Sequence, residues 1–297
     1  MVIMMRKYKI QLAAAMIIFG TIGLVRRYIP YTSGLVAFAR GFLGALFLLI
    51  LHIVKNEKFP RKKLRENAVL LTASGAALGI NWIFLFEAYQ YTTVSAATMS
   101  YYMAPVFVIL ASPFMLDEKI SLKKGAASLT AVIGMVLVSG VADTGIQGGK
   151  GIIFGLAAAV FYAGLIILNK KIENLSSKDR TIFQLGIAAA VILPYVIITE
   201  DFSSIEIEAF PLFMLLIAGI LHTGIAYALY FGSMRKVPAQ TVALFSYIDP
   251  VTAVILSSLV LKEEMTAAAA AGVVMIIGSA LISEIDFSNI IGKKKRA

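Results

Sequence analysis

The sequence has no cysteine, one tryptophan and only two histidines among its 297 residues. Without cysteine, the chain cannot form a disulfide, a thiolate metal site or a cysteine nucleophile. Neither histidine lies in a recognised catalytic motif, so no nucleophile and base can be assigned. We therefore expect no enzyme activity, no cofactor and no metal, with an intramembrane enzyme kept as an alternative.

Charge is also scarce, because 15% of the residues are charged and 59% are apolar, whereas an ordinary soluble domain has roughly 25% charged residues. Apolar runs near the length that crosses a bilayer, about 20 residues, follow one another with short polar breaks. They lie at Ile10–Val25, Leu35–Val54, Asn67–Tyr89, Val94–Leu116, Leu122–Val141, Gly151–Leu168, Ile182–Ile198, Phe210–Phe231, Ala239–Leu261 and Met265–Ile282. The first run resembles a signal peptide, but nine more follow, so we take it as a helix. Because the runs are continuous and do not alternate, they predict an all-α integral membrane protein with ten transmembrane helices.

The formal net charge of +10 would suit a nucleic-acid partner, but the basic residues are unevenly distributed between the predicted helices. Of the 27 lysines and arginines, 22 fall in the ends and loops of one side, Arg40 falls inside a helix, and four fall on the other side: Arg26, Arg27, Lys150 and Lys262. Positive residues collect on the cytoplasmic side of membrane proteins. The bias predicts a multi-pass protein of the cell membrane with both termini in the cytoplasm, and no nucleic-acid partner.

The sequence repeats itself at an offset of 145 residues without a gap. This shift superimposes seven identical pairs: Phe86/Phe231, Tyr102/Tyr247, Pro105/Pro250, Val106/Val251, Ser112/Ser257, Leu116/Leu261 and Glu118/Glu263. Similar apolar composition could produce some of these matches, but Tyr-x-x-Pro followed by Glu is a polar framework. The repeat predicts two five-helix halves, residues 1–143 and 144–297, and five is odd, so the second half is inverted. Inverted repeats allow one central site to open to either side in turn, which favours transport.

Several motifs carry a family resemblance. They are Phe19-Gly20, Arg40-Gly41-Phe42-Leu43, Asn81-Trp82, Ala88-Tyr89, Ser95-Ala96-Ala97, Tyr102-Met103-Ala104-Pro105-Val106, Glu118-Lys119-Ile120-Ser121, His222-Thr223-Gly224-Ile225-Ala226-Tyr227 and Tyr247-Ile248-Asp249-Pro250-Val251. On these motifs nearly the whole chain resembles the EamA family of the drug/metabolite transporter superfamily. The resemblance implies a ten-helix transporter fold that moves amino acids, related metabolites or drugs, and it favours export. Phe19 stands where the family more usually has tryptophan.

Two prolines, Pro105 and Pro250, fall at matching positions near the middle of the predicted fourth and ninth helices. Each removes an amide donor, which should free the carbonyl four residues earlier, at Tyr101 and Ser246. Helices broken at matching midplane positions indicate a binding site. A bend made only for packing is the alternative.

Asp249 lies about ten residues into its helix, roughly 15 Å from the helix end and close to the middle of the bilayer. An ionisable group at that depth needs a partner or a proton and is a functional candidate. Arg40 enters from the opposite side and reaches a comparable depth. A purely structural ion pair between the two residues is the alternative to substrate binding.

Other polar and aromatic residues within the spans are candidates for substrate contact: Asn81, Trp82, Tyr101, Tyr102, Tyr227 and Tyr247. Glu87 lies nearer the external end of its helix, so contact with water is as good an explanation as substrate binding. His222 could exchange a proton near neutral pH, but a single histidine in an apolar helix is more often hydrogen-bonded to a neighbour.

These features predict a secondary active transporter of small polar metabolites, such as amino acids, that works by alternating access as a monomer or homodimer in the lipid bilayer. The opposite charges of Asp249 and Arg40 suit a zwitterion. Proton coupling is a further hypothesis, because the chain has buried carboxylates and no nucleotide-binding motif. A cation or drug efflux transporter is an alternative, and a membrane protein that binds a ligand without moving it is an alternative of another class.

Overall fold

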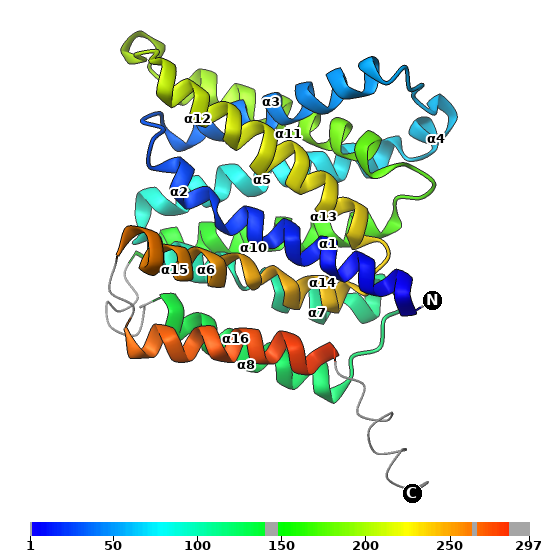
Figure 1. Cartoon of the computed structure of the whole chain (residues 1–297), viewed down its shortest axis with the longest axis vertical. Coiled ribbons are helices and arrows are strands. Elements are labelled where there is room, and N and C mark those ends of the chain that lie inside the picture. Colours follow the sequence, from blue (N-terminus) through cyan, green and yellow to red (C-terminus); the bar gives the residue numbers. More distant parts are fainter. Residues whose placement is uncertain (1, 140–147, 263–265, 285–297) are drawn as a thin grey trace, which may run out of the picture.

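The computed structural model describes residues 2–139, 148–262 and 266–284 (Figure 1), and within these ranges the secondary structure is entirely helical. The first half contains α1 (Val2–Gly20), α2 (Ile22–Arg26), α3 (Ser33–Val54), α4 (Arg61–Glu66), α5 (Ala68–Tyr91), α6 (Val94–Tyr101), α7 (Ala104–Met115) and α8 (Leu122–Ser139). The second half contains α10 (Gly149–Lys171), α11 (Ser177–Thr199), η1 (Phe202–Ser204), α12 (Ala209–Gly219), η2 (Ile220–Ile225), α13 (Ala226–Met234), α14 (Ala239–Ser246), α15 (Ile248–Leu261) and α16 (Ala267–Glu284).

The prediction of ten membrane helices is confirmed. Nine segments of the described residues are long and apolar enough to cross a membrane, and Ala267–Ile282 supplies a shorter tenth. One predicted start, Ile182, is late: α11 already begins at Ser177, because the Ser176 hydroxyl accepts a hydrogen bond from the Asp179 N–H at 3.0 Å and caps the helix. The predicted helix ends at Val141 and Met265 lie outside the described residues.

The two halves pack in a symmetric pattern. α3 packs on α11 and α8 packs on α16, so each of these helices contacts its counterpart in the other half. α7 packs on α14, which joins the fourth span to the ninth. The contact of α5 with α10 is matched by the contact of α13 with α1. Figure 1 shows α8 and α16 side by side at one edge of the bundle. Since each half contributes five spans, the second half crosses in the opposite sense, as an inverted repeat requires.

Glu118 joins the two halves at one end of the bundle. Both of its carboxylate oxygens accept a hydrogen bond from the Ala239 N–H, each at 2.9 Å, and the Lys170 ammonium lies 3.1 Å from one of them. Ala239 is the first residue of α14, and Pro238 before it supplies no side-chain cap. The Glu118 carboxylate therefore caps α14 from the other half and lies against the positive end of its dipole.

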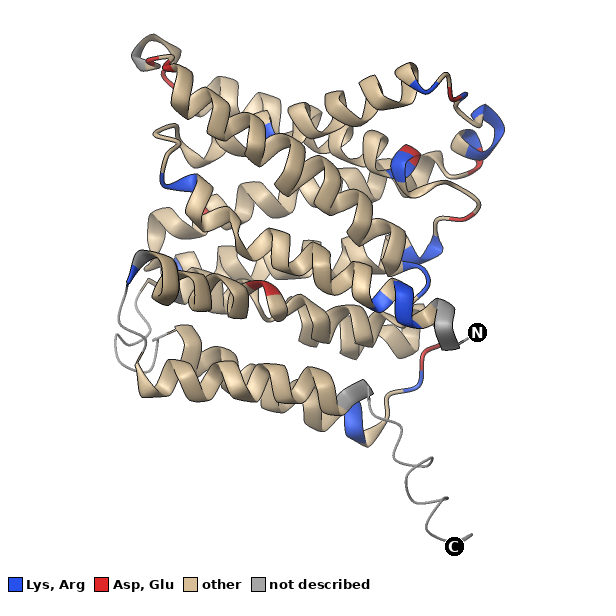
Figure 2. Ribbon diagram, viewed as in Figure 1, with Lys and Arg blue, Asp and Glu red and all other residues tan. Residues whose placement is uncertain are grey.

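Lysine and arginine residues gather at the end of the bundle where the N-terminus lies (Figure 2). Ion pairs hold part of this end together: Lys178 bonds to Glu57 between the two halves, and Arg235 lies 3.9 Å from Glu173. The charge asymmetry of the sequence is thus a property of one surface of the folded chain.

The outer faces of the helices expose large apolar side chains, among them Ile50 on α3, Leu129 on α8, Val160 on α10 and Val274 on α16. Soluble proteins rarely expose such continuous apolar surface. The helices also satisfy their own backbone hydrogen bonds, so this surface suits contact with lipid chains.

Candidate functional site

The fourth and ninth spans are both broken near their middle. The break between α6 and α7 falls at Tyr102 and Met103, and the break between α14 and α15 falls at Tyr247. Pro105 and Pro250 lie in the first turn of the helix that follows each break. At that position the missing amide donor costs no helical hydrogen bond. Each proline therefore helps to begin a new half-helix at the same place in the two repeats.

The two breaks contact each other in the middle of the bundle. The Tyr247 hydroxyl donates a hydrogen bond to the Tyr102 carbonyl at 3.0 Å, and these residues are 145 positions apart, the offset of the sequence repeat. Their ring centres lie 6.4 Å from each other. Half-helix ends from both repeats are thus brought to a single site.

A cavity of about 550 Å³ begins at these breaks and extends toward the end of the bundle opposite the basic surface, where Arg26 and Ile29 line it. Its volume lies within the range of small-molecule sites. Five of the predicted binding residues line it: Arg40, Tyr101, Tyr102, Tyr227 and Asp249. The cavity therefore combines a carboxylate, a guanidinium and phenol groups from both halves of the chain.

Asp249 lies in the first turn of α15, where the positive end of the half-helix favours a negative charge. Arg40 faces the same cavity from α3, and its Nε donates to the Thr223 hydroxyl at 3.1 Å. The Arg40 guanidinium also lies 5.4 Å from the centre of the Trp82 ring. Among the described ion pairs there is none within 4.0 Å between Arg40 and Asp249. Both charges therefore lie on the cavity without neutralising each other by direct contact.

Aromatic side chains close the cavity on the side of the basic surface. The Tyr227 ring packs edge-on against Phe19 at 4.9 Å, and the hydroxyls of Tyr162 and Tyr230 are hydrogen-bonded at 2.8 Å. Tyr230 and the adjacent Phe231 are fully buried. In this conformation the site is separated from the basic end of the bundle by an aromatic layer.

The sequence profile of the EamA-like transporter family matches residues 7–140 and 149–284, once for each half. The chain belongs to this family.

The uncharacterized transporter YxxF of Bacillus subtilis (strain 168) is 30% identical to this chain over 253 residues, which cover 84% of the chain and 80% of the relative. Protein PecM of Dickeya dadantii (strain 3937) is 25% identical over 225 residues, 73% of each protein. A crystal structure of a protein with 19% sequence identity matches with a TM-score of 0.81 over 94% of this chain and 98% of the other. At that identity the likeness shows the fold alone. The EamA-like chain is thus a multi-pass membrane protein of the transporter kind.

Three predicted site residues lie away from the cavity of this EamA-like transporter. Asn81 is fully buried and its amide donates to a carbonyl of α10 at 2.7 Å. His222 contacts the Thr21 hydroxyl through Nε2 at 2.8 Å, and Glu87 accepts a hydrogen bond from the Tyr195 hydroxyl at 2.8 Å. Each of the three joins separate segments of the bundle, and none of them is among the described residues that line the cavity.

Two further predicted residues, Trp82 and Tyr247, lie behind the cavity wall. Trp82 is 7% exposed and supports both Arg40 and Tyr227, whose ring lies 6.0 Å away. Tyr247 is fully buried and connects the two helix breaks. Their contacts place them next to residues that line the cavity.

Sequence reasoning missed Tyr89, Thr98 and Tyr162, all of which line the cavity, and Tyr230 beneath it. A signal for Tyr230 was available, because it follows Tyr227 by three residues and shares its helix face. Nothing along the sequence pairs Tyr162 with Tyr230, since they come from α10 and α13.

The eighth span contains a π-helical turn, η2, that the sequence did not predict. It lets the Thr223 hydroxyl donate to the Ala218 carbonyl at 2.9 Å while it accepts from Arg40. A side chain at Gly44 would lie only 3.0 Å from the Gly219 carbonyl, so α3 approaches η2 closely. π-Helical turns are frequent at functional sites, and here the turn fixes the Arg40 guanidinium.

Proposed function

We propose that this EamA-like transporter carries small polar metabolites that bear both a positive and a negative group, with amino acids as the leading class. The observation that carries the proposal is the placement of Asp249 and Arg40 on one cavity without a direct ion pair between them. A zwitterion offers an ammonium to the carboxylate and a carboxylate to the guanidinium, in a setting where unpaired charge is costly.

The transport mechanism in this proposal is alternating access at the paired helix breaks. In the described conformation the cavity extends from Tyr102 and Asp249 to one end of the bundle, and the layer of Tyr162, Tyr230 and Phe231 closes the other end. Because the two halves have related packing, an exchange of their conformations would close the first path and open the second. No chemical step is part of the proposal.

The orientation and direction are also proposals. The basic end, with the N-terminus, would lie in the cytoplasm of a cell carrying this protein in its plasma membrane, because basic residues collect on that side. The described cavity would then face outward. We favour export, in which the substrate enters from the basic end and leaves through this cavity.

Proton coupling would use Asp249, which is the one carboxylate among the described residues that line the cavity. A carboxylate at the midplane of a membrane needs a cation, a proton or a substrate ammonium. If a proton and the substrate compete for it, an imposed pH gradient drives solute movement. Flux that does not respond to such a gradient would reject this coupling.

A second candidate is the efflux of organic cations. The specific observation in its favour is that the Asp249 carboxylate is accompanied by Tyr101, Tyr102 and Tyr227, whose rings can bind a cation by its charge. In that case Arg40 is a structural residue held by Thr223 and does not contact the substrate.

The test begins with thermal unfolding of the purified protein in the presence of amino acids, polyamines, choline-like cations, nucleosides and sugars, since a bound ligand raises the unfolding temperature. Each stabilising compound is then followed as a radiolabelled solute in proteoliposomes. We expect saturable flux of a zwitterion. Flux only of cations without a carboxylate would favour the second candidate, and binding without any flux would contradict a transporter.

A further inference from the structure

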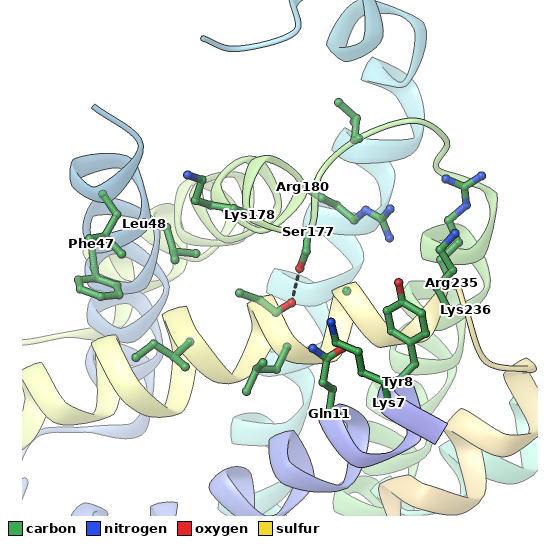
Figure 3. Close-up of a pocket in the computed structure, with 16 residues that line it drawn as sticks. Lys7, Tyr8, Gln11, Phe47, Leu48, Ser177, Lys178, Arg180, Arg235 and Lys236 are labelled. Atoms are coloured by element: carbon green, nitrogen blue, oxygen red, sulfur yellow. Dashed lines mark hydrogen bonds between the residues drawn. The ribbon is translucent and has the colours of Figure 1, made fainter. Parts of the chain in front are cut away.

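A second cavity, of about 630 Å³, lies at the basic end of the bundle (Figure 3). It is built from α1, α3, the start of α11, and the segment from η2 through α13. Five cations line it: Lys7, Lys178, Arg180, Arg235 and Lys236. Among the described residues that line it there is no acidic side chain, whereas the central cavity has Asp249. The chemistry of this cavity is therefore that of an anion site.

The carboxylates around this cavity neutralise only part of its charge. Lys178 is bonded to Glu57, and Arg235 has Glu173 at 3.9 Å. Among the described residues, no carboxylate lies within 4.0 Å of the charged groups of Lys7, Arg180 or Lys236. Figure 3 shows Lys7 and Arg180 extending into the same space between their helices, with Tyr8 beside them. Positive charge without a neighbouring carboxylate thus lies on this cavity.

Among these cations, Arg180 is the one that a bound anion would stabilise most. The residue is 3% exposed, and its Nε has no hydrogen-bond partner in the protein. Its only described contacts are weak, from one terminal nitrogen to the carbonyls of Asn169 at 3.4 Å and Phe231 at 3.3 Å. A buried guanidinium without a carboxylate is costly, and a phosphate group is a geometric match for it.

The opposite wall of the cavity is apolar. Phe47, Leu48 and Leu51 of α3 line it together with Ile225 and Leu229 of the eighth span. The neighbouring surfaces of the flanking helices expose Ile10, Ile50 and Ile53, which is the character of a lipid-facing surface. An occupant that combines a phosphate with a hydrocarbon chain would fit both walls, since basic pockets between membrane helices bind anionic lipid headgroups.

We propose that this cavity binds an anionic phospholipid, with the phosphate against Arg180, Lys7 and Lys236 and an acyl chain along Phe47, Leu51 and Leu229. The proposal rests on the geometry of this cavity and does not depend on which solute the central cavity carries. The bound lipid would join α1, α3 and α11, and would couple the protein to the composition of the membrane leaflet at its basic end.

The test uses the full chain in nanodiscs of phosphatidylcholine alone or of phosphatidylcholine with phosphatidylglycerol. Retained lipid is measured by native mass spectrometry and stability by thermal unfolding. The variant Lys7→Gln/Lys236→Gln changes two exposed cavity lysines and should fold. The matched control, Lys62→Gln/Lys63→Gln, changes two exposed lysines of α4 outside the cavity. A third arm adds inorganic phosphate to phosphatidylcholine nanodiscs.

We expect phosphatidylglycerol to be retained and to raise the unfolding temperature of the native chain and of the control variant. Removal of the two cavity lysines should weaken retention by roughly fivefold for each lysine, the effect of about 1 kcal/mol per basic group near an anionic lipid. Equal retention by the two variants would overturn the proposal. Full stabilisation by inorganic phosphate alone would also overturn it, because the occupant would then be a soluble anion.

Discussion

Both repeats contain a broken helix, but only the second repeat has a charged residue at the break. Tyr102-Met103-Ala104-Pro105 in the first repeat corresponds to Tyr247-Ile248-Asp249-Pro250 in the second. Both segments interrupt a span, and the two tyrosines contact each other across the repeat offset. At the third position, however, Ala104 is 1% exposed and packs in the core, whereas Asp249 lines the cavity.

This difference shows that the two repeats share the residues that shape the fold but do not share the charged residue at the break. Proline and tyrosine, present in both repeats, account for the half-helices and for their contact. The carboxylate is present in one repeat only, so the binding site is asymmetric although the fold around it is related by symmetry. In the proposed function, this one position supplies the negative charge that binds the ammonium of the substrate.

The largest expected effect comes from the unmatched carboxylate. Asp249→Asn keeps the size of the side chain but removes its charge, so solute flux should fall at least about tenfold, the loss of one charge-assisted contact of ~1.5–3 kcal/mol. The matched variant in the first repeat, Ala104→Ser, should retain flux. Proteoliposome transport at equal protein content measures both. Normal flux in Asp249→Asn would show that the asymmetry has no role in transport.

Replacement of the two prolines should produce a smaller difference between the repeats. Both lie in the first turn of a half-helix, so replacement with alanine should change the free energy of unfolding by less than about 1 kcal/mol. Pro250→Ala should nevertheless slow flux more than Pro105→Ala, because Pro250 restricts the backbone of the preceding residue, Asp249. Transport and thermal unfolding of both variants check this. Equal flux in the two variants would contradict the expected difference between Pro250 and Pro105.

A substitution at Glu118 tests the contact between the repeats. Its counterpart Glu263 lies outside the described residues, but Glu118 caps α14 and pairs with Lys170. Glu118→Gln should lower stability by about 1–2 kcal/mol. The control Glu173→Gln removes the exposed carboxylate beside Arg235 and should cost less than about 0.5 kcal/mol. Thermal unfolding in detergent that ranks the two variants in the reverse order would exclude the capping role.

The smallest expected effect belongs to Glu57, which connects the first half to α11 at the basic end. The hydrogen bond from Lys178 lowers the pKa of this exposed carboxyl. A lowered pKa contributes stability above the unfolded-state value, about 4.3, and that contribution is lost as the pH falls through the folded-state value. Glu57→Gln should therefore lower the unfolding temperature slightly at pH 7 and have less effect below about pH 4.

The control for this contact is Glu66→Gln, which changes an exposed carboxylate of α4. It should lower the unfolding temperature at pH 7 less than Glu57→Gln does. A Glu57→Gln effect that is the same at neutral and acid pH would mean that the ion pair does not stabilise the chain.

Much of this architecture could be predicted from the sequence because it follows from properties along the chain. Span length and the matched positions of Pro105 and Pro250 follow from counting residues. Partners from other helices could not be predicted in this way. The sequence does not indicate that Asn81 bonds to α10 or that His222 contacts Thr21, since those contacts depend on helix packing.

The contacts of Arg40 within the site could not be predicted from the sequence either. The sequence predicts that Arg40 lies within the second span, and a direct pair with Asp249 was the alternative to substrate binding. Its observed position depends on the π-helical turn that presents Thr223 and on the ring of Trp82. Such a turn depends on tertiary packing near Gly44, which no local pattern in the sequence indicates.

The measurement that tests the central claim most directly uses the absence of cysteine in the chain. A single cysteine at Ala253, which lines the central cavity, is exposed to a membrane-impermeant maleimide from the outside or from the inside of sealed vesicles. Arg27→Cys and Lys62→Cys, at opposite ends of the bundle, serve as controls that each react from one side. Alternating access predicts that Ala253→Cys reacts from both sides. Reaction from one side only, with and without a transported solute, would contradict it.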